Sequence, residues 1–243
     1  MNTIRQQLQA LASSKSSDSW AAAFRRKRFA LFEDLLDSLG TSSVTILDVG
    51  GTQEFWEVMK FGGSPHKIIL LNLFATSVRH SNFISMAGDA RRLSQFADQS
   101  VDVVFSNSVI EHLGTYANQR LMADEIRRVG KSYFVQTPNF FFPVEPHFLC
   151  PLFHWLPFWA RRWLIQRFSL GNLTRKPSQA EAEKTLSEFR LLKKSEVRAL
   201  FPDAAIHSEK VLGLAKSFIA VKARALRTPS PDRPVKTSLK YAE

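Results

Sequence analysis

The chain has 243 residues, of which 44% are hydrophobic and 23% are charged. These fractions are ordinary for a folded domain and exclude a chain that is disordered throughout. The single cysteine, Cys150, excludes an intramolecular disulfide and a thiolate metal cluster, so we expect a reducing compartment. No uninterrupted apolar run approaches the ~20 residues of a membrane span.

The net charge of +11 is unevenly distributed, because Phe140–Glu243 contains 18 basic and 9 acidic residues. A basic half suits nucleic acid, an anionic membrane surface or an acidic substrate. No RNA-binding motif accompanies it, so we do not expect a nucleic-acid partner. The acid-free segment Met1–Ser17 fits a polar terminus or an organelle transit peptide. Of these two we expect the polar terminus. We expect the protein to be cytoplasmic and, in one interpretation, to lie against the inner face of the membrane.

The first predicted element is an amphipathic helix from Trp20 to Leu39, ended by Gly40. Its basic flank, Arg25–Arg28, is interpreted as a solvated face. Short apolar runs then alternate with helical segments. The predicted strands are Val44–Val49, Lys67–Leu71, Asn82–Met86, Val101–Phe105 and Ser132–Gln136, and the helices between them are Gln53–Phe61 and Tyr116–Val129. This alternation predicts parallel βαβ units in a doubly wound α/β fold.

The character of the chain changes after Pro138. Aromatic residues, prolines and arginines crowd the segment Phe140–Phe168, and a linker-like stretch, Asn172–Ala180, follows. A helix at about Ser195–Leu200 and a hairpin then complete the domain, with predicted strands Ala204–Leu212 and Lys216–Ala223. We expect a helical segment over 1–40, one domain over 41–225 with an aromatic cap at about 140–180, and a disordered tail over 226–243.

Polar and small residues follow the first two predicted strands. Ligands of open parallel sheets bind outside the carboxyl ends of the strands. Gly50 and Gly51 would let the backbone approach a ligand closely, and Asp48 suits an ammonium group. Asn72 lies 24 residues after Asp48, near the spacing at which a polar residue meets a ribose in dinucleotide folds. If no ligand binds, the glycines form only a tight strand-to-helix turn and Asn72 is only a surface turn residue.

The next two strand ends continue this pattern. Asp89 could accept a hydrogen bond from an adenine amino group beside the amide of Ala90, or it could cap a turn. Ser106 and Asn107 would face the same crevice. His112, a few residues further on, fits a structural or a catalytic role.

Three segments, Leu47–Gly50, Gly88–Ala90 and Asp102–Leu113, together resemble the motifs of class I S-adenosylmethionine-dependent methyltransferases. The resemblance covers Thr41–Asn139 and implies a Rossmann-like, seven-stranded, mostly parallel sheet whose last strand is antiparallel. It implies S-adenosyl-L-methionine as cofactor. No metal site is expected, because His147 and His154 are seven residues apart without further candidate groups beside them. The residues implied around the cofactor are Asp48, Gly50 and Gly51 at its methionine part, Asn72 at its ribose, Asp89 and Ala90 at its adenine, and Ser106 and Asn107 at its sulfonium.

The resemblance implies methyl transfer to a small-molecule or lipid-like acceptor. Thr52 and Glu54 stand where the family usually has glycine, and Asn72 replaces the usual ribose acid. These departures are also consistent with a different function. In this alternative, the chain is a non-catalytic protein with a methyltransferase fold that binds a membrane surface or a protein partner.

Residues after the fourth and fifth strands border the acceptor in this fold. Candidate general bases there are His147, Glu145 and His112. The segment Phe153–Phe168 combines tryptophans with arginines, which is typical of an interfacial segment and also of an aromatic lid. Its helix is expected to begin at Pro157, with Trp159 and Trp163 on one face.

Overall fold

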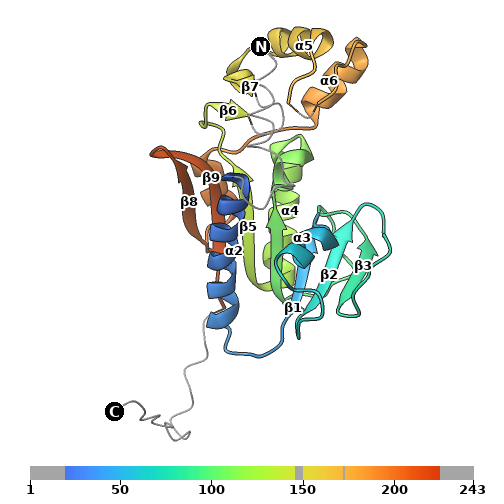
Figure 1. The fold of residues 1–243 in the computed structure, drawn as a ribbon, viewed down its shortest axis with the longest axis vertical. Coiled ribbons are helices and arrows are strands. Elements are labelled where there is room, and N and C mark those ends of the chain that lie inside the picture. Colours follow the sequence, from blue (N-terminus) through green and yellow to red (C-terminus); the bar gives the residue numbers. More distant parts are fainter. Residues whose placement is uncertain (1–19, 146–149, 172, 225–243) are drawn as a thin grey trace, which may run out of the picture.

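The computed structural model describes residues 20–145, 150–171 and 173–224. Seven strands form one sheet in the order β3-β2-β1-β4-β5-β9-β8 (Figure 1). Strands β1 to β5 are parallel, whereas β9 runs antiparallel to both β5 and β8. The strands are β1 Thr45–Val49, β2 Lys67–Asn72, β3 Phe83–Ala87, β4 Val101–Asn107, β5 Gly130–Pro138, β8 Ala205–Val211 and β9 Leu214–Lys222. The predicted doubly wound sheet with one antiparallel strand is confirmed.

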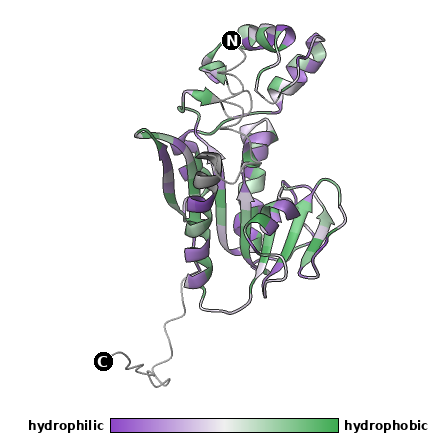
Figure 2. Ribbon diagram, viewed as in Figure 1, coloured by the Kyte–Doolittle hydropathy of each residue, from purple (hydrophilic) through white to green (hydrophobic). Residues whose placement is uncertain are grey.

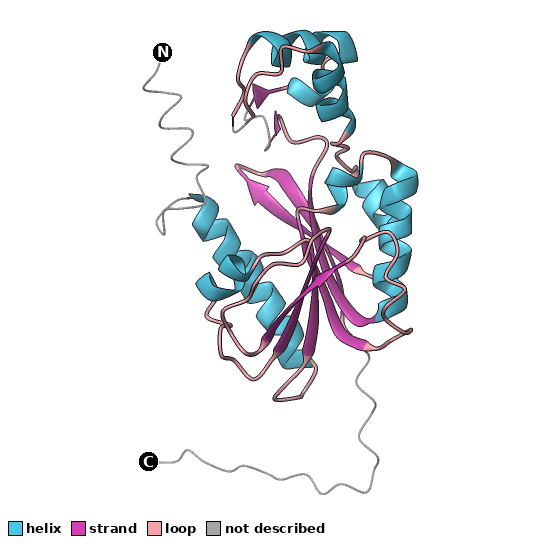
Figure 3. Ribbon diagram, turned by 90° about the vertical axis from the view of Figure 1, so that its right-hand side faces the viewer, coloured by secondary structure: helices cyan, strands magenta, loops and turns pink. Residues whose placement is uncertain are grey.

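Helices cover both faces of this sheet (Figure 3). One face packs against α2 (Trp20–Ser38) and α3 (Gln53–Val58), where Phe32 and Trp56 are fully buried. The other face packs against α4 (Tyr116–Val129) and α7 (Lys194–Leu200). Strands buried on both faces need apolar runs, and β1 and β2 are accordingly apolar at most of their positions (Figure 2).

A small cap follows β5 and lies over the carboxyl ends of the parallel strands (Figure 1). Its own core contains Phe153, Ile165, Ala182 and Leu186. The elements between β4 and the cap's end are the 3-10 turn η1 Ile110–Leu113, then β6 Val144–Glu145, β7 Cys150–Pro151, η2 Phe153–Trp155, α5 Phe158–Arg167 and α6 Gln179–Ser187. As predicted, α5 begins directly after Pro157.

Two predictions about local structure are wrong. The predicted linker Asn172–Ala180 runs into α6, whose helix had no counterpart in the sequence analysis, because only a few of its residues face an apolar partner. The basic flank Arg25–Arg28 is not wholly a solvated face, because the Arg28 side chain is only 11% exposed. The tail from 226 to 243 lies outside the described residues. No described helix is long and apolar enough to cross a membrane.

Candidate functional site

The turn after β1 is built around the Asp48 carboxyl group. Asp48 is buried, and its Oδ2 accepts a hydrogen bond of 2.6 Å from the indole Nε1 of Trp56 on α3. A Cβ at position 51 would overlap this carboxyl group, so only glycine fits there. Gly50 adopts a φ of +83°, which also favours glycine, and Val109 packs closely against it. The two glycines are therefore required by the turn itself.

Burial controls the protonation of Asp48. Desolvation raises its pKa from 3.8 to about 7, against the opposing effect of the Trp56 hydrogen bond. Within the described part of the chain, its second oxygen, Oδ1, is buried and has no hydrogen-bond partner. An unpaired carboxylate oxygen at a strand end fits a bound ammonium group.

Asn72 lies beside this turn at the end of β2. Its side-chain Nδ2 donates a hydrogen bond of 2.8 Å to the carbonyl of Gly51. Glu54, at one of the unusual positions of the loop, pairs at 3.0 Å with Arg79 on the surface, where both side chains are exposed. Backbone hydrogen bonding, together with that pairing, holds the pKa of Glu54 below its ordinary value. Its negative charge is thereby balanced by a cation of the protein.

The end of β3 is occupied by an ion pair. The Asp89 carboxylate binds the Arg91 guanidinium, with a shortest distance of 2.6 Å, and also accepts from the Arg91 backbone amide. These bonds lower the pKa of Asp89. Ala90 packs against the core under the sheet's α4 face. An adenine amino group at Asp89 would have to share the carboxylate with Arg91.

At the end of β4, Ser106 and Asn107 already have protein partners. Ser106 is buried, and its Oγ donates to the carbonyl of Val49 at 3.2 Å. Asn107 accepts a short hydrogen bond from Arg28 of α2. Arg28 also donates to Gln136 Oε1 at 3.1 Å and forms a 2.7 Å ion pair with Glu209.

This Arg28 network is the main feature that the sequence analysis missed. It joins α2 to the carboxyl ends of β4 and β5 and to β8. A cavity of about 110 Å³ beside it is lined by Arg28, Ser108, Gln136, Asn139 and Lys216, among others. The only signal in the sequence was one arginine within a basic run, which did not distinguish it from its exposed neighbours Arg26 and Lys27.

The three candidate bases lie in different segments of the chain. His112 is exposed on η1, and its ring packs against Phe189 with centroids 4.9 Å apart. Next to it, Glu111 is buried and accepts a hydrogen bond of 3.1 Å from Thr137. Glu145 lies in β6, next to the cap, and His147 lies outside the described residues. The described residues contain no group of three His, Cys, Asp or Glu side chains that could hold a metal ion.

Comparison with known proteins identifies the region that carries these strand ends. Residues 47–133 match a family described as a methyltransferase domain. They include all eight residues implied around the cofactor. This region resembles a methyltransferase domain. The family resemblance predicted from the motifs is thereby confirmed.

Solved structures agree with this domain at the level of the fold. Magnesium protoporphyrin IX methyltransferase from Synechocystis PCC 6803, crystallised with bound SAH, has a TM-score of 0.51 and 8% identity, over 91% of this chain and 96% of that one. A protein from Rhodobacter sphaeroides, provisionally assigned as a Zn-dependent alcohol dehydrogenase, also has a TM-score of 0.51, with 12% identity over 79% and 87% of the two chains. Because these two proteins are assigned different activities, the likeness concerns the fold. No curated protein sequence matches the chain.

Proposed function

We propose that this protein transfers the methyl group of S-adenosylmethionine to a small-molecule or lipid-like acceptor. The observation that carries the proposal is the methyltransferase domain at residues 47–133, because the polar strand ends of the sheet fall within it. The cap over those ends would then enclose the acceptor.

The described residues fit the cofactor at three strand ends. When bound, S-adenosylmethionine supplies an electrophilic methyl group on a sulfonium. Asp48 Oδ1 would accept from its ammonium group, and Asn72 Oδ1 would accept from a ribose hydroxyl while Nδ2 holds the Gly51 carbonyl. Asp89 and the amide of Ala90 would meet the adenine, with Arg91 sharing the carboxylate. Ser106 and Asn107 would act by fixing the strand ends, since both are engaged within the protein.

Catalysis would depend mainly on positioning, because methyl transfer requires the acceptor atom in line with the sulfonium. An oxygen or nitrogen acceptor also loses a proton, for which His112, Glu145 and His147 are the candidate bases. His112 is favoured among the described residues, since its ring lies against Phe189 at the cap's edge.

Replacing Asn72 tests where the cofactor binds. We expect Asn72→Ala to bind S-adenosylhomocysteine about tenfold more weakly than the native protein in calorimetric titration, because one ribose hydrogen bond and the tether to Gly51 are lost. The matched control is Asn82→Ala, which removes a similar amide–carbonyl tether, to Phe61, at the amino end of the neighbouring strand β3. Equal loss of affinity in both variants would contradict binding at the end of β2.

The exposed face of α5 favours a second candidate, a methyltransferase-fold protein that binds membranes. Trp159 is 68% exposed and Trp163 is 52% exposed, and Phe158 and Phe168 flank them. Aromatic rings beside arginines suit the headgroup region of an anionic membrane. The arginines contribute unequally, however, because Arg162 pairs with Glu183 at 2.5 Å whereas Arg167 is exposed.

Vesicle co-sedimentation tests this contact. We expect the protein to pellet with vesicles containing phosphatidylserine at low salt, and to be released as salt rises. The double variant Trp159→Ser/Trp163→Ser should remain largely in the supernatant, whereas Leu212→Ser, which changes an exposed apolar residue on the β8–β9 turn, should pellet like the native chain. Native protein that stays in the supernatant at low salt would leave α5 as part of an internal lid.

A further inference from the structure

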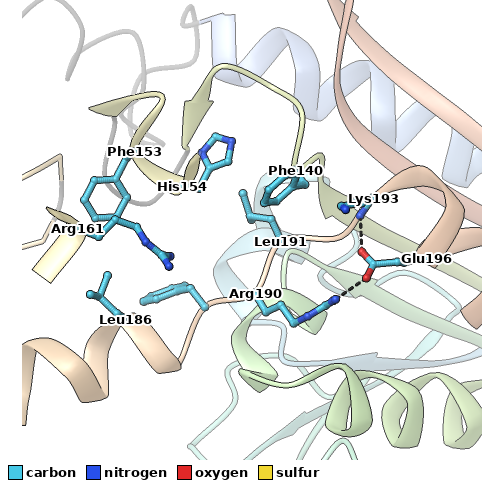
Figure 4. A pocket seen from close by; sticks show the side chains of 10 residues that line it. Phe140, Phe153, His154, Arg161, Leu186, Arg190, Leu191, Lys193 and Glu196 are labelled. Carbon is cyan, nitrogen blue, oxygen red and sulfur yellow. Dashed lines mark hydrogen bonds and ion pairs between the residues drawn. The ribbon is translucent and has the colours of Figure 1, made fainter. Parts of the chain in front are cut away.

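A cavity of about 200 Å³ lies between the cap and the sheet domain (Figure 4). We call it the cap cavity, and the lining residues used below are Phe140, Phe153, Phe189, Arg161, Arg190 and Lys193. Its walls come from the segment after β5, from η2 and α5 of the cap, and from the segment between α6 and α7. Its size suits a molecule built on a single ring, since pockets for drug-sized ligands are larger, roughly 300–1,000 Å³.

The walls of the cap cavity are attached directly to the strand ends where an acceptor must enter. The amide of Phe140 donates to the carbonyl of Leu192 at 3.0 Å, and the amide of Arg190 donates to the carbonyl of Glu111 on η1 at 2.8 Å. On the same side, Phe189 contacts the ring of His112. The walls of the cap cavity are therefore tied to the turns that follow β4 and β5.

Two of the three cations in the cap cavity have partners within the protein. Arg190 forms an ion pair with Glu196 and donates to Gln119 Oε1 at 2.8 Å. The other oxygen of Glu196 accepts from the Lys193 amide at 2.8 Å. The Lys193 ammonium lies 5.5 Å from the ring centre of Phe140, in a cation–π contact. Both carboxylate oxygens of Glu196 are thus engaged, one by the Arg190 guanidinium and the other by the Lys193 amide.

Arg161 differs from Arg190, because its guanidinium has no anionic partner among the described residues. Its Nε is buried without a hydrogen-bond acceptor, and its guanidinium projects into the cap cavity (Figure 4). Its Cζ lies 5.8 Å from the centre of the Phe158 ring, in a cation–π contact. Burial lowers the pKa of Arg161, as desolvation without an anion must. A half-buried, planar guanidinium without an anionic partner is suited to a carboxylate.

We propose that the cap cavity binds the methyl acceptor as a small aromatic carboxylate, with the Arg161 guanidinium on the carboxylate and the ring between Phe140, Phe153 and Phe189. The aromatic walls exclude water and favour edge or stacked contacts with a ring. The proposal rests on the proposed methyl transfer for the ligand's role as acceptor. The binding of the carboxylate itself does not depend on it.

Calorimetry with benzoate and 4-hydroxybenzoate, without cofactor, tests the cap cavity. We expect both to bind, and benzamide and acetate to bind at least tenfold more weakly, because one lacks the charge and the other lacks the ring. Arg161→Gln should weaken benzoate binding at least tenfold, and Arg161→Lys should weaken it less. The matched control is Arg167→Gln on the same helix, where the arginine is exposed, and it should bind benzoate like the native protein.

The outcomes separate this proposal from the proposed function. Benzoate affinity that is unchanged in Arg161→Gln, equal binding of benzamide, or no binding of either benzoate overturns the carboxylate site. Carboxylate binding by a protein that does not bind S-adenosylmethionine would uphold the site and overturn methyl transfer. Cofactor binding without carboxylate binding would overturn the carboxylate site and leave the proposed methyl transfer standing.

Discussion

Arg28→Met is expected to lower the free energy of unfolding by about 3–5 kcal/mol, the range for breaking a buried ion pair from one side. The substitution leaves the Glu209 carboxylate, whose side chain is 8% exposed, without its cation, and it removes the donor shared by Asn107 and Gln136. Urea denaturation at neutral pH measures the effect. Lys27→Met is the matched control, because Lys27 is the exposed neighbour on the same helix and should change stability by less than about 0.5 kcal/mol.

A second substitution distinguishes a lost ion pair from general damage to α2. Adding Glu209→Gln to Arg28→Met removes the uncompensated charge, while the amide still accepts from Ser217. The double variant should therefore be more stable than Arg28→Met alone. A double variant that is less stable than the single one would show that Glu209 is not left as an unpaired charge.

The protonation of Asp48 should make stability fall as pH rises through the weakly acidic range. Its pKa is about 7 in the folded protein and about 3.8 in the unfolded chain, so the folded state retains a proton that the unfolded state has lost between those values. The stabilisation of the folded state by the protonated Asp48 carboxyl group is fully present below pH 3.8 and is lost as the pH rises to about 7. The full loss amounts to about 4 kcal/mol at 1.36 kcal/mol per pH unit of difference.

Asp48→Asn isolates this contribution, because asparagine is nearly isosteric and cannot ionise. The side-chain oxygen can still accept from Trp56. The stability of the native protein relative to this variant should decline from pH 4 to pH 7 and then level off, while other titrating groups cancel in the difference. A difference that is constant over that range would mean that Asp48 is already ionised in the folded protein at pH 4.

The sheet was predictable because its signals are local. Buried parallel strands need apolar runs, and Val101–Phe105 lies within β4 for that reason. The helix Tyr116–Val129 was predicted with both of its ends, since its apolar residues recur at helical spacing. The seven strands and the antiparallel last strand were implied by the resemblance of three motifs, not by periodicity.

What could not be predicted depends on contacts between distant parts of the chain. Arg28 and Glu209 are 181 residues apart, and nothing local marks either as buried. Helix α6 has a short apolar face that is meaningful only against α5. Likewise, the residues around the cap cavity come from three separate segments, so the unpaired charge of Arg161 emerges only once the cap has folded.

Titration of the native protein with S-adenosylmethionine at pH 8, where Asp48 is ionised, tests the central claim most directly. We expect one site per chain in calorimetry and a rise in the unfolding temperature as the ligand saturates. No detectable heat and no thermal shift at millimolar cofactor would contradict methyl transfer by this protein, whatever its fold.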